Sequence, residues 1–413
     1  MTTLEELVEL EYEDEELVPD ILPVDTRLSI RGEVFRLISL IERAAEVVPV
    51  REIIQNTSHA LLEAFSATKE TAAYARITAT DGNQAVSVIN DSISVSMAGY
   101  VLIPPKKVLD ILKNAPSVYA RIEVLGNTCT ISSGRARWTL QLPVGDRLPP
   151  LPDVEGIETS SVACKDLLKA LVVARKAISA KSARVSLLQA LIRDGWITGA
   201  DGARLHRAYV PGLDESLETT IPLRALDELI RALMSTEEDS VEFGANAQHV
   251  VAKLGDDVLI SQKRLMEYPN VDKGITEAAL VNQNTLTVDV AELAGVIKRV
   301  RVNSDPDQSA IFLGLIPGKE DSEGNPEWVL AVRARDRLGN AAQEVMDVTW
   351  TGSKKARELC VNHKQLSDLL SAFPAALATF QIGDDTKAIR MPLFIEDLTV
   401  GFVGLIQQMT STI

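Results

Sequence analysis

A pattern of strand, Asp-Gly turn and returning strand occurs twice in the chain, 120 residues apart. The stretches "YARITATDGNQAVSVI" (74–89) and "ITGADGARLHRAYV" (197–210) alternate apolar and polar residues on either side of Asp-Gly. Because glycine supplies the positive φ that a tight turn needs, each stretch predicts a β-hairpin. A third copy with a longer turn, "EWVLAVRARDRLGNAAQEVMDV" (327–348), places Asp336 135 residues after Asp201.

Helical patterns recur with the hairpins. Val34, Leu37, Ile38, Ile41 and Ala45 follow the spacing of one helix face, and the other helical stretches repeat such a pattern. Prolines at 104, 105 and 222 suit a first helical turn, where a missing N–H costs nothing. Two helices are therefore predicted in each copy, over 34–48 and 104–114, 164–181 and 222–234, and 289–301 and 362–373.

These repeats predict an α+β chain of three domains, each with two helices packed on a largely antiparallel sheet. We expect domains at 27–155, 156–279 and 280–413, after an acidic and flexible N-terminal tail at 1–26. The stretches "PVGDRLPPLPDVEG" (143–156) and "YPNVDKGITEAA" (268–279) are rich in turn-forming residues, and we predict that both are linkers.

Composition is typical of a cytoplasmic globular protein. The chain has 413 residues, of which 46% are hydrophobic and 24% charged, and no apolar run approaches the ~18 residues of a membrane span. The acidic N-terminus is unlike a signal or transit peptide. Cys129, Cys164 and Cys360 are widely separated, which favours reduced, buried thiols over a disulfide or metal site.

The sequence offers no motif for catalysis. It contains no glycine-rich phosphate loop, nucleophile elbow or paired-histidine metal motif, so we expect no cofactor, no metal and no enzymatic activity. Asp201 and His206 lie within six residues, which allows the alternative interpretation of a catalytic acid beside a histidine. Since the Asp-Gly turn recurs in each unit, an architectural role is favoured for Asp201.

Charge is unevenly distributed along the chain. The net charge is −16, but residues 1–26 hold ten acidic residues and no Lys or Arg, and the remainder has 48 acidic against 42 basic residues, a net charge of −6. The six predicted helices together carry +7. If the repeats align these helices on one side, their basic residues form a surface for the phosphate backbone of a nucleic acid, without base reading. The alternative is that they simply solvate helix faces. The candidates are Lys106, Lys113, Lys165, Lys169, Arg175, Lys176, Lys181, Lys298, Arg299 and Arg301.

The order of these motifs resembles a known family, the beta subunit (sliding clamp) of bacterial DNA polymerase III. The resemblance covers about residues 27–409, and its most specific parts are "ATDG" (79–82), "ADGARL" (200–205) and "SSGRARWTLQLP" (132–143). Each of the first two is followed by a helix that Ile-Pro opens. The family implies a homodimeric ring around DNA, closed head to tail between the first domain of one chain and the third of the other.

The resemblance also implies two sets of contact residues. At the ring closure, Lys107, Trp138 and Leu140 would face Val300 and Val302; alternatively, Trp138 and Leu140 pack within their own domain. Between domains 2 and 3, a pocket would bind short peptides of polymerases, the clamp loader and repair proteins; alternatively, its apolar residues only join the two domains. The residues matching this pocket are Arg184, Leu187, Gly202, Arg204, Leu205, Pro269, Val403 and Leu405.

The sequence departs from the family at several positions. Ala200 and Ala203 stand where the family usually has Thr and His, and the chain ends in "GLIQQMTSTI" rather than a compact Met-Pro-Met-Arg-Leu-like strand. The segment "PGKEDSEGNPEW" (317–328) and the acidic tail are additional. We therefore expect a DNA sliding clamp of divergent type. The alternative is a clamp-fold interaction scaffold, from a phage, a mobile element or a second gene copy, with altered partners or no DNA encirclement.

Overall fold

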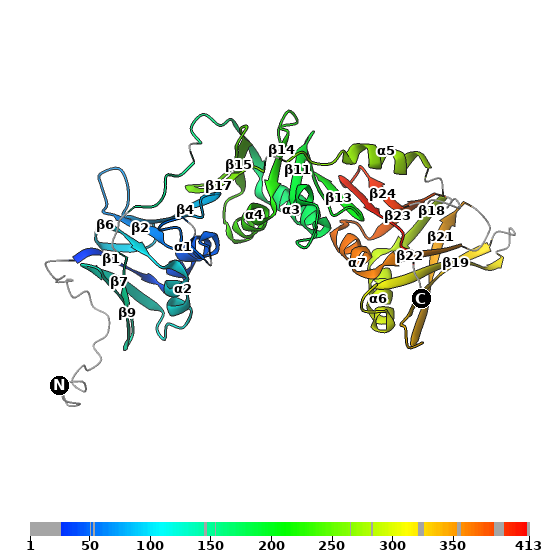
Figure 1. Ribbon diagram of the computed structural model, residues 1–413, viewed down its shortest axis with the longest axis horizontal. Helices are drawn as coiled ribbons and strands as arrows, with labels where there is room; N and C mark the ends of the chain where they lie inside the picture. Colours follow the sequence, from blue (N-terminus) through cyan, green and yellow to red (C-terminus); the bar gives the residue numbers. More distant parts are fainter. Residues whose placement is uncertain are drawn as a thin grey trace. The chain divides into compact units, whose positions relative to one another are not determined.

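The computed structural model describes residues 26–49, 51–52, 54–143, 147–152, 154–264, 266–281, 284–320, 326–352, 357–383 and 392–410. The chain forms two compact units (Figure 1): unit 1 comprises residues up to 150 except 83–86, and unit 2 comprises 83–86 and 151–413. The acidic tail predicted at 1–26 lies outside the described residues except for Thr26.

Unit 1 contains two sets of antiparallel strands. In the first, the spatial order is β5 (Ser94–Met97), β1 (Thr26–Glu33), β7 (Tyr119–Leu125), β8 (Thr128–Ser133) and β9 (Ala136–Gln141). In the second, β2 (Ala60–Phe65) lies between β3 (Tyr74–Thr80) and β6 (Gly99–Ile103). The predicted Asp-Gly turn follows β3 and leads into β4 (Gln84–Asn90), with Gly82 at a φ of 90°.

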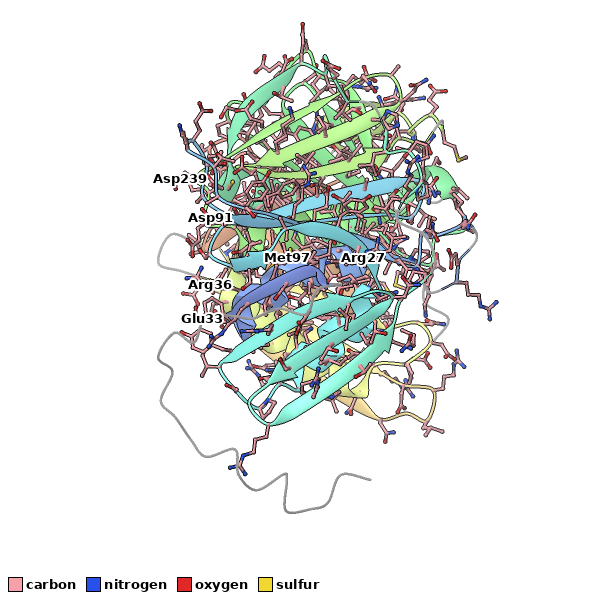
Figure 2. All side chains as sticks on the ribbon, turned by 90° about the vertical axis from the view of Figure 1, so that its left-hand side faces the viewer. Arg27, Glu33, Arg36, Asp91, Met97 and Asp239 are labelled. Carbon is pink, nitrogen blue, oxygen red and sulfur yellow. The ribbon has the colours of Figure 1, made fainter. Side chains whose placement is uncertain are left out.

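Two helices complete unit 1. Helix α1 (Val34–Val47) begins directly after β1, and Glu33 at the end of that strand pairs with Arg36 at 3.0 Å (Figure 2). The buried face of α1 includes Leu37, Leu40 and Ile41. Helix α2 (Pro105–Lys113) packs beside α1 and has proline at its first position, as the sequence predicts.

Unit 2 also contains two sheets. One has the order β10 (Thr159–Ala163), β15 (Ser240–Ala245), β16 (His249–Leu254) and β17 (Asp257–Gln262). The other has twelve strands, in the order β14 (Thr219–Pro222), β11 (Gln189–Arg193), β12 (Trp196–Ala200), β13 (Arg204–Tyr209), β25 (Phe402–Ile406), β24 (Leu393–Asp397), β23 (Leu377–Ile382), β18 (Asn284–Asp289), β21 (Ala341–Thr351), β20 (Pro326–Arg335), β19 (Ala310–Glu320) and β22 (Arg357–Asn362).

The second and third predicted domains meet at the pairing of β13 with β25. The strands run antiparallel, with Leu205 opposite Leu405 and His206 opposite Gly404. This pairing makes one continuous sheet from residues about 200 apart in sequence, and it positions the site described below.

Four helices of unit 2 lie on one side of this sheet (Figure 1): α3 (Cys164–Ala177), α4 (Leu223–Ser235), α6 (Val290–Val300) and α7 (His363–Ala372). All six helices predicted from apolar spacing are thus present, and the α+β fold class is confirmed. The predicted hairpins at β12–β13 and β20–β21 are also present, and Cys129, Cys164 and Cys360 are buried and unbridged.

The prediction of a turn-rich structure at 268–279 is wrong, because most of this segment is a helix, α5 (Val271–Val281). The side chain of Asn270 accepts a hydrogen bond from the Lys273 N–H at 3.1 Å, which caps the first turn. Val271, Ile275 and Ala278 follow helical spacing and pack on the sheet. The other predicted linker, 143–156, contains no helix or strand among its described residues.

Candidate functional site

An apolar pocket of about 500 Å³ lies in unit 2 beside the Asp201–Gly202 turn. Its walls come from the end of β12, the turn, the start of β13, the 3-10 turn at Val185–Leu187, the end of β25 and helix α5. This volume suits one or two large apolar side chains of a ligand. The lining residues are Leu187, Ala200, Gly202, Ala203, Arg204, Leu205, Val271, Gly274, Ile275, Glu277, Ala278, Pro392, Leu405 and Gln407.

A buried hydrophobic cluster forms the floor of the pocket. Leu205 and Leu405, which pair across β13 and β25, are 7% and 8% exposed, and Val403 of the same cluster is 3% exposed. Tyr268 is buried in the same cluster, where burial raises the pKa of its hydroxyl. The floor is therefore shielded from solvent by neighbouring side chains.

Successive residues of β13 point to opposite faces of the sheet, because side chains alternate along a strand. Leu205 and Arg207 face helix α5, whereas Arg204 and His206 face α3 and α7. The pocket and the helix-covered face therefore meet along this one strand.

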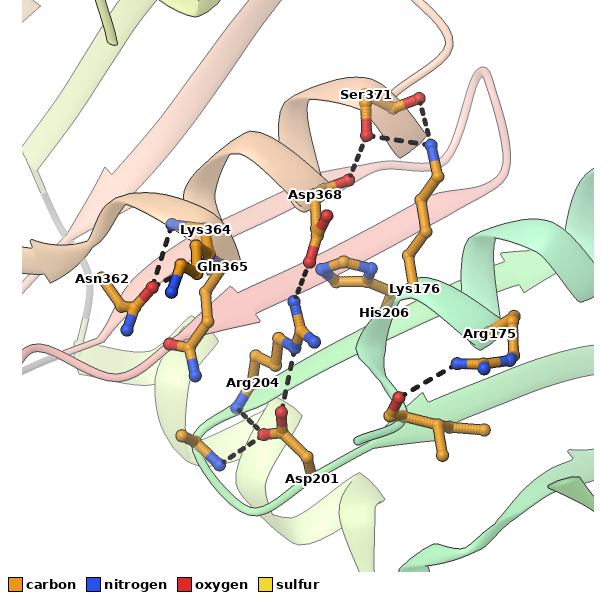
Figure 3. Close-up of polar contacts among 12 residues, drawn as sticks. Arg175, Lys176, Asp201, Arg204, His206, Asn362, Lys364, Gln365, Asp368 and Ser371 are labelled. Carbon is orange, nitrogen blue, oxygen red and sulfur yellow. Dashed lines mark hydrogen bonds and ion pairs between the residues drawn. The ribbon is translucent and has the colours of Figure 1, made fainter. Parts of the chain in front are cut away.

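The Asp201 carboxylate stabilises the turn through hydrogen bonds. It accepts hydrogen bonds from the backbone N–H groups of Ala203 and Arg204 at 3.0 and 3.1 Å. The guanidinium of Arg204 pairs with Asp201 at 3.0 Å and with Asp368 of α7 at 2.5 Å (Figure 3). Arg204 lines the pocket, but its charge links the turn to the third predicted domain.

His206 is fully buried, and its Nδ1 lies 3.3 Å from the carbonyl oxygen of Val173 in α3. Burial, together with the nearby charge of Arg204, lowers the pKa of His206 to about 3. The ring is therefore neutral near pH 7. It packs against Phe402 in the sheet, with ring centroids 6.3 Å apart.

The predicted pocket residues divide into two groups. Leu187, Gly202, Arg204, Leu205 and Leu405 line the cavity. The remaining three do not: Val403 lies in the buried floor, while Arg184 and Pro269 are exposed outside the lining.

Sequence reasoning missed the contribution of α5. This helix supplies Val271, Gly274, Ile275, Glu277 and Ala278, more lining residues than any other element. The spacing of 271, 275 and 278 carried a helical signal, but Gly274 and the surrounding turn-forming residues obscured it.

Ion pairs fix the start of α5 on the sheet. The Asp272 carboxylate lies 2.8 Å from Arg207 of β13 and 3.2 Å from Arg193 of β11. Arg207 in turn lies over the ring of Trp196, 4.9 Å from its centroid. The helix is therefore a docked wall of the pocket.

Several basic residues predicted to contact DNA have partners within the protein. Arg175 pairs with Asp227 at 2.5 Å, Lys113 with Glu42 at 2.7 Å, and Arg299 with Glu344 at 2.6 Å. Pairing raises the pKa of Lys113 and of Arg299.

Two other lysines among the candidates donate hydrogen bonds to hydroxyl or carbonyl oxygens of the protein. Lys176 donates to the Ser371 hydroxyl and carbonyl oxygens, each at 2.9 Å (Figure 3), and burial lowers its pKa. Lys106 donates to the Val48 carbonyl oxygen at 2.9 Å. The remaining candidates are exposed: Lys165, Lys169, Lys181, Lys298 and Arg301.

The residues predicted at a ring closure occupy different environments. Trp138 and Leu140 are half-buried on the edge strand β9, opposite Ile131 and Cys129. Val302 is 80% exposed. Val300, the last residue of α6, is buried at 2% exposure, and Lys107 is exposed on α2.

Comparison with solved structures defines the fold class. The DNA polymerase III beta subunit of Pseudomonas aeruginosa superposes with a TM-score of 0.76 at 18% identity, covering 93% of this chain and all of the other. A Bartonella birtlesii sliding clamp bound to griselimycin gives 0.78 at 21% identity over the same shares. The Thermotoga maritima beta subunit gives 0.78 at 16% identity, covering 94% of this chain and all of the other. The chain therefore has the DNA clamp fold.

Sequence comparison agrees over the first part of the chain. Residues 28–151 match the family of the DNA polymerase III beta subunit, N-terminal domain. No curated protein matches the chain in sequence. The resemblance stated from the motifs is confirmed: residues 28–151 match the family model of the N-terminal domain, and the fold of the chain is similar to that of bacterial DNA polymerase III beta subunits.

Two features are absent from the described residues. No group of three or more His, Cys, Asp or Glu side chains in the described ranges could hold a metal ion. In that same part of the chain, no helix is long and apolar enough to cross a membrane.

Proposed function

We propose that this protein is a non-catalytic DNA sliding clamp, a homodimer that encircles duplex DNA and holds DNA-processing proteins through short peptides. The single observation that carries this proposal is the pocket at the β13–β25 junction of a clamp fold, lined by the turn that the sequence singles out. The pocket is apolar, of ligand size, and placed where the two predicted domains join.

Unpaired strand edges support closure of the ring. Among the described strands, β9 pairs only with β8, and residues 341–348 of β21 pair only with β20. Exposed edges of this kind favour pairing with another chain. The half-buried Trp138 and Leu140 lie at the first edge. Near the second, Val345 is 49% exposed, and Asn303, next to Val302, donates to the Ala341 carbonyl oxygen. The proposed contact joins these two edges head to tail.

DNA contact is assigned to the exposed basic residues on or beside α3 and α6. Lysines and arginines without interleaved aromatic rings suit phosphates rather than bases, so the ring could move along the duplex. The candidates that form internal pairs, such as Arg175 and Arg299, contribute less in this proposal.

The experiment is retention on circular DNA. The protein is placed on a nicked plasmid by a bacterial clamp loader with ATP, and the protein–DNA complex is isolated by gel filtration. We expect the protein to co-elute with the circle and to be released when a restriction enzyme linearises it. Equal retention on linear DNA with free ends would contradict encirclement.

A clamp-fold scaffold that does not encircle DNA is the second candidate. The observation that favours it is the pairing of Lys113, Arg175 and Arg299 with acidic side chains, which reduces the charge available to phosphates. A protein that binds the peptide but fails the plasmid assay as a monomer would support the scaffold.

A further inference from the structure

Three arginines form a row across the first sheet of unit 1. In the register of this sheet, Arg31 of β1 lies opposite Arg121 of β7. Arg121 lies opposite Ser132 of β8, which in turn lies opposite Arg137 of β9. Because residues directly opposite each other in an antiparallel sheet share one face, the three arginines point to the same side. We call them the arginine row.

The arginine row lies on the solvent face of the sheet. The residues one position along three of these strands are fully buried isoleucines: Ile30, Ile122 and Ile131. Successive side chains alternate between faces, so the arginines point away from the core. Arg137 is exposed, and Arg31 and Arg121 are half-buried. The guanidinium of Arg31 lies over the ring of Tyr119, 5.6 Å from its centroid, which holds its charge at this surface.

The charge of the row suits an anionic ligand. Like charges at opposite positions of two strands lower the stability of a sheet, and Arg31 and Arg121 occupy such positions. Of the two carboxylates that flank the row in register, Glu33 pairs with Arg36 at 3.0 Å, and Glu123 lies two residues along β7 from Arg121. The row therefore carries excess positive charge. Guanidinium groups bind carboxylates and phosphates through paired hydrogen bonds.

The N-terminal acidic segment of the chain, residues 1–25, has the complementary charge. It contains ten Asp and Glu residues and no Lys or Arg. It leads directly into β1, the strand that carries Arg31. The row crosses three strand spacings, roughly 14 Å, whereas an extended chain of this length reaches up to ~80 Å. The acidic segment is therefore long enough to meet all three arginines.

We propose that the acidic segment binds the arginine row of its own chain. Because the two are covalently linked, the contact forms at an effective concentration on the order of millimolar. The bound segment keeps the phosphates of nucleic acids off this face, so it acts as a competitor that belongs to the chain itself. This inference goes beyond the proposed clamp function and does not depend on it.

Zero-length crosslinking of the full chain tests the contact. Arg121→Lys keeps the positive charge and introduces an amine, which a carbodiimide couples to a carboxylate in contact with it. We expect mass spectrometry to find crosslinks between this amine and residues 1–25, and we expect them to be lost at high salt, because ions screen the contact. Arg51→Lys is the matched control, since Arg51 is exposed in unit 1 but lies outside the row. Its crosslinks to the segment should stay at background. Mixing isotopically labelled and unlabelled chains distinguishes crosslinks within one chain from those between chains.

Binding of a fluorescent single-stranded oligonucleotide, measured by anisotropy at low salt, tests the competition. Replacing the ten acidic residues of the segment by Asn or Gln should lower Kd at least ~5-fold, because the competitor is lost. In a chain that also carries Arg31→Ser, Arg121→Ser and Arg137→Ser, the same replacement should change Kd by less than ~2-fold. The full effect should remain in a control that replaces three exposed basic residues of unit 2 by serine: Lys253, Arg264 and Arg335.

The outcomes separate a specific contact from general charge repulsion. If neutralising the segment changes Kd by the same factor with and without the arginine row, or leaves Kd unchanged in both, the proposed contact is overturned. Crosslinks found only between labelled and unlabelled chains would give the row to a second copy and also overturn it. If circular dichroism shows that the serine variant does not fold, the crosslinks of Arg121→Lys decide, and their absence overturns the proposal.

Discussion

Removing the Asp272 carboxylate should loosen α5 from the sheet. This carboxylate contacts Arg207 at 2.8 Å and Arg193 at 3.2 Å, but its side chain is 42% exposed. Exposed pairs contribute ~0.2–1 kcal/mol, whereas hydrogen bonds to charged groups reach ~1.5–3 kcal/mol. Arg207 is only 13% exposed, whereas the Asp272 carboxylate is partly solvated. We therefore assign the two contacts together a stabilising free energy of about 1 kcal/mol. Asp272→Ala should therefore raise the open population of α5 about fivefold.

Hydrogen–deuterium exchange of the α5 amides measures this directly. Hydrogen exchange of the amides at 274–280 should be about fivefold faster in Asp272→Ala than in wild type. Raising the salt concentration should accelerate exchange in wild type by a smaller factor, because ions screen the ion pairs. Glu277→Ala is the control on the same helix: its pair with Lys273 is 3.8 Å long and exposed on both sides, so exchange should not change. Unaltered exchange in Asp272→Ala would show that apolar contacts alone hold the helix.

Three further predictions concern the floor, the edge and the buried histidine. Leu205→Ala should weaken binding of a polymerase peptide by ~1–3 kcal/mol, while the mass of the protein measured by light scattering stays unchanged. Charged replacements of Trp138 and Leu140 should yield monomers, because burying a charge at the contact is costly; a dimer of unchanged mass would refute the interface. His206 has a folded pKa of about 3, below that of the unfolded chain, so its contribution to stability is present above pH ~6.5 and is lost as pH falls. Between pH 7 and 5, urea unfolding of wild type should lose ~2 kcal/mol more than that of His206→Phe.

Local patterns predicted much of the fold. Helices such as α1 and α3 show strong apolar periodicity, and the Asp-Gly turns carry their conformational requirement in the sequence: Gly82 and Gly202 have φ of 90° and 94°. Both signals are local, so they can be interpreted without knowing what lies nearby in space.

The missed features depend on distant partners. Helix α5 is fixed by Asp272, whose partners Arg193 and Arg207 lie 79 and 65 residues away in sequence. Likewise, a count of helix charge could not reveal that Arg175 pairs with Asp227, 52 residues away. Tertiary contacts decide whether a weak helix forms and whether a charge is available.

Strand β13 explains why the pocket and the helix-covered face can act separately. Leu205 and Arg204 are neighbours in sequence, yet Leu205 belongs to the pocket floor and Arg204 is tied to Asp368 of α7 on the opposite face. A change at Leu205 alters the pocket floor, whereas a change at Arg204, which also lines the pocket, breaks the ion pair between the turn and the third predicted domain. In the proposed clamp, the same alternation would let partner binding vary through α5 and the floor while the β13–β25 junction is kept. Divergence at the pocket is therefore compatible with retention of the clamp fold.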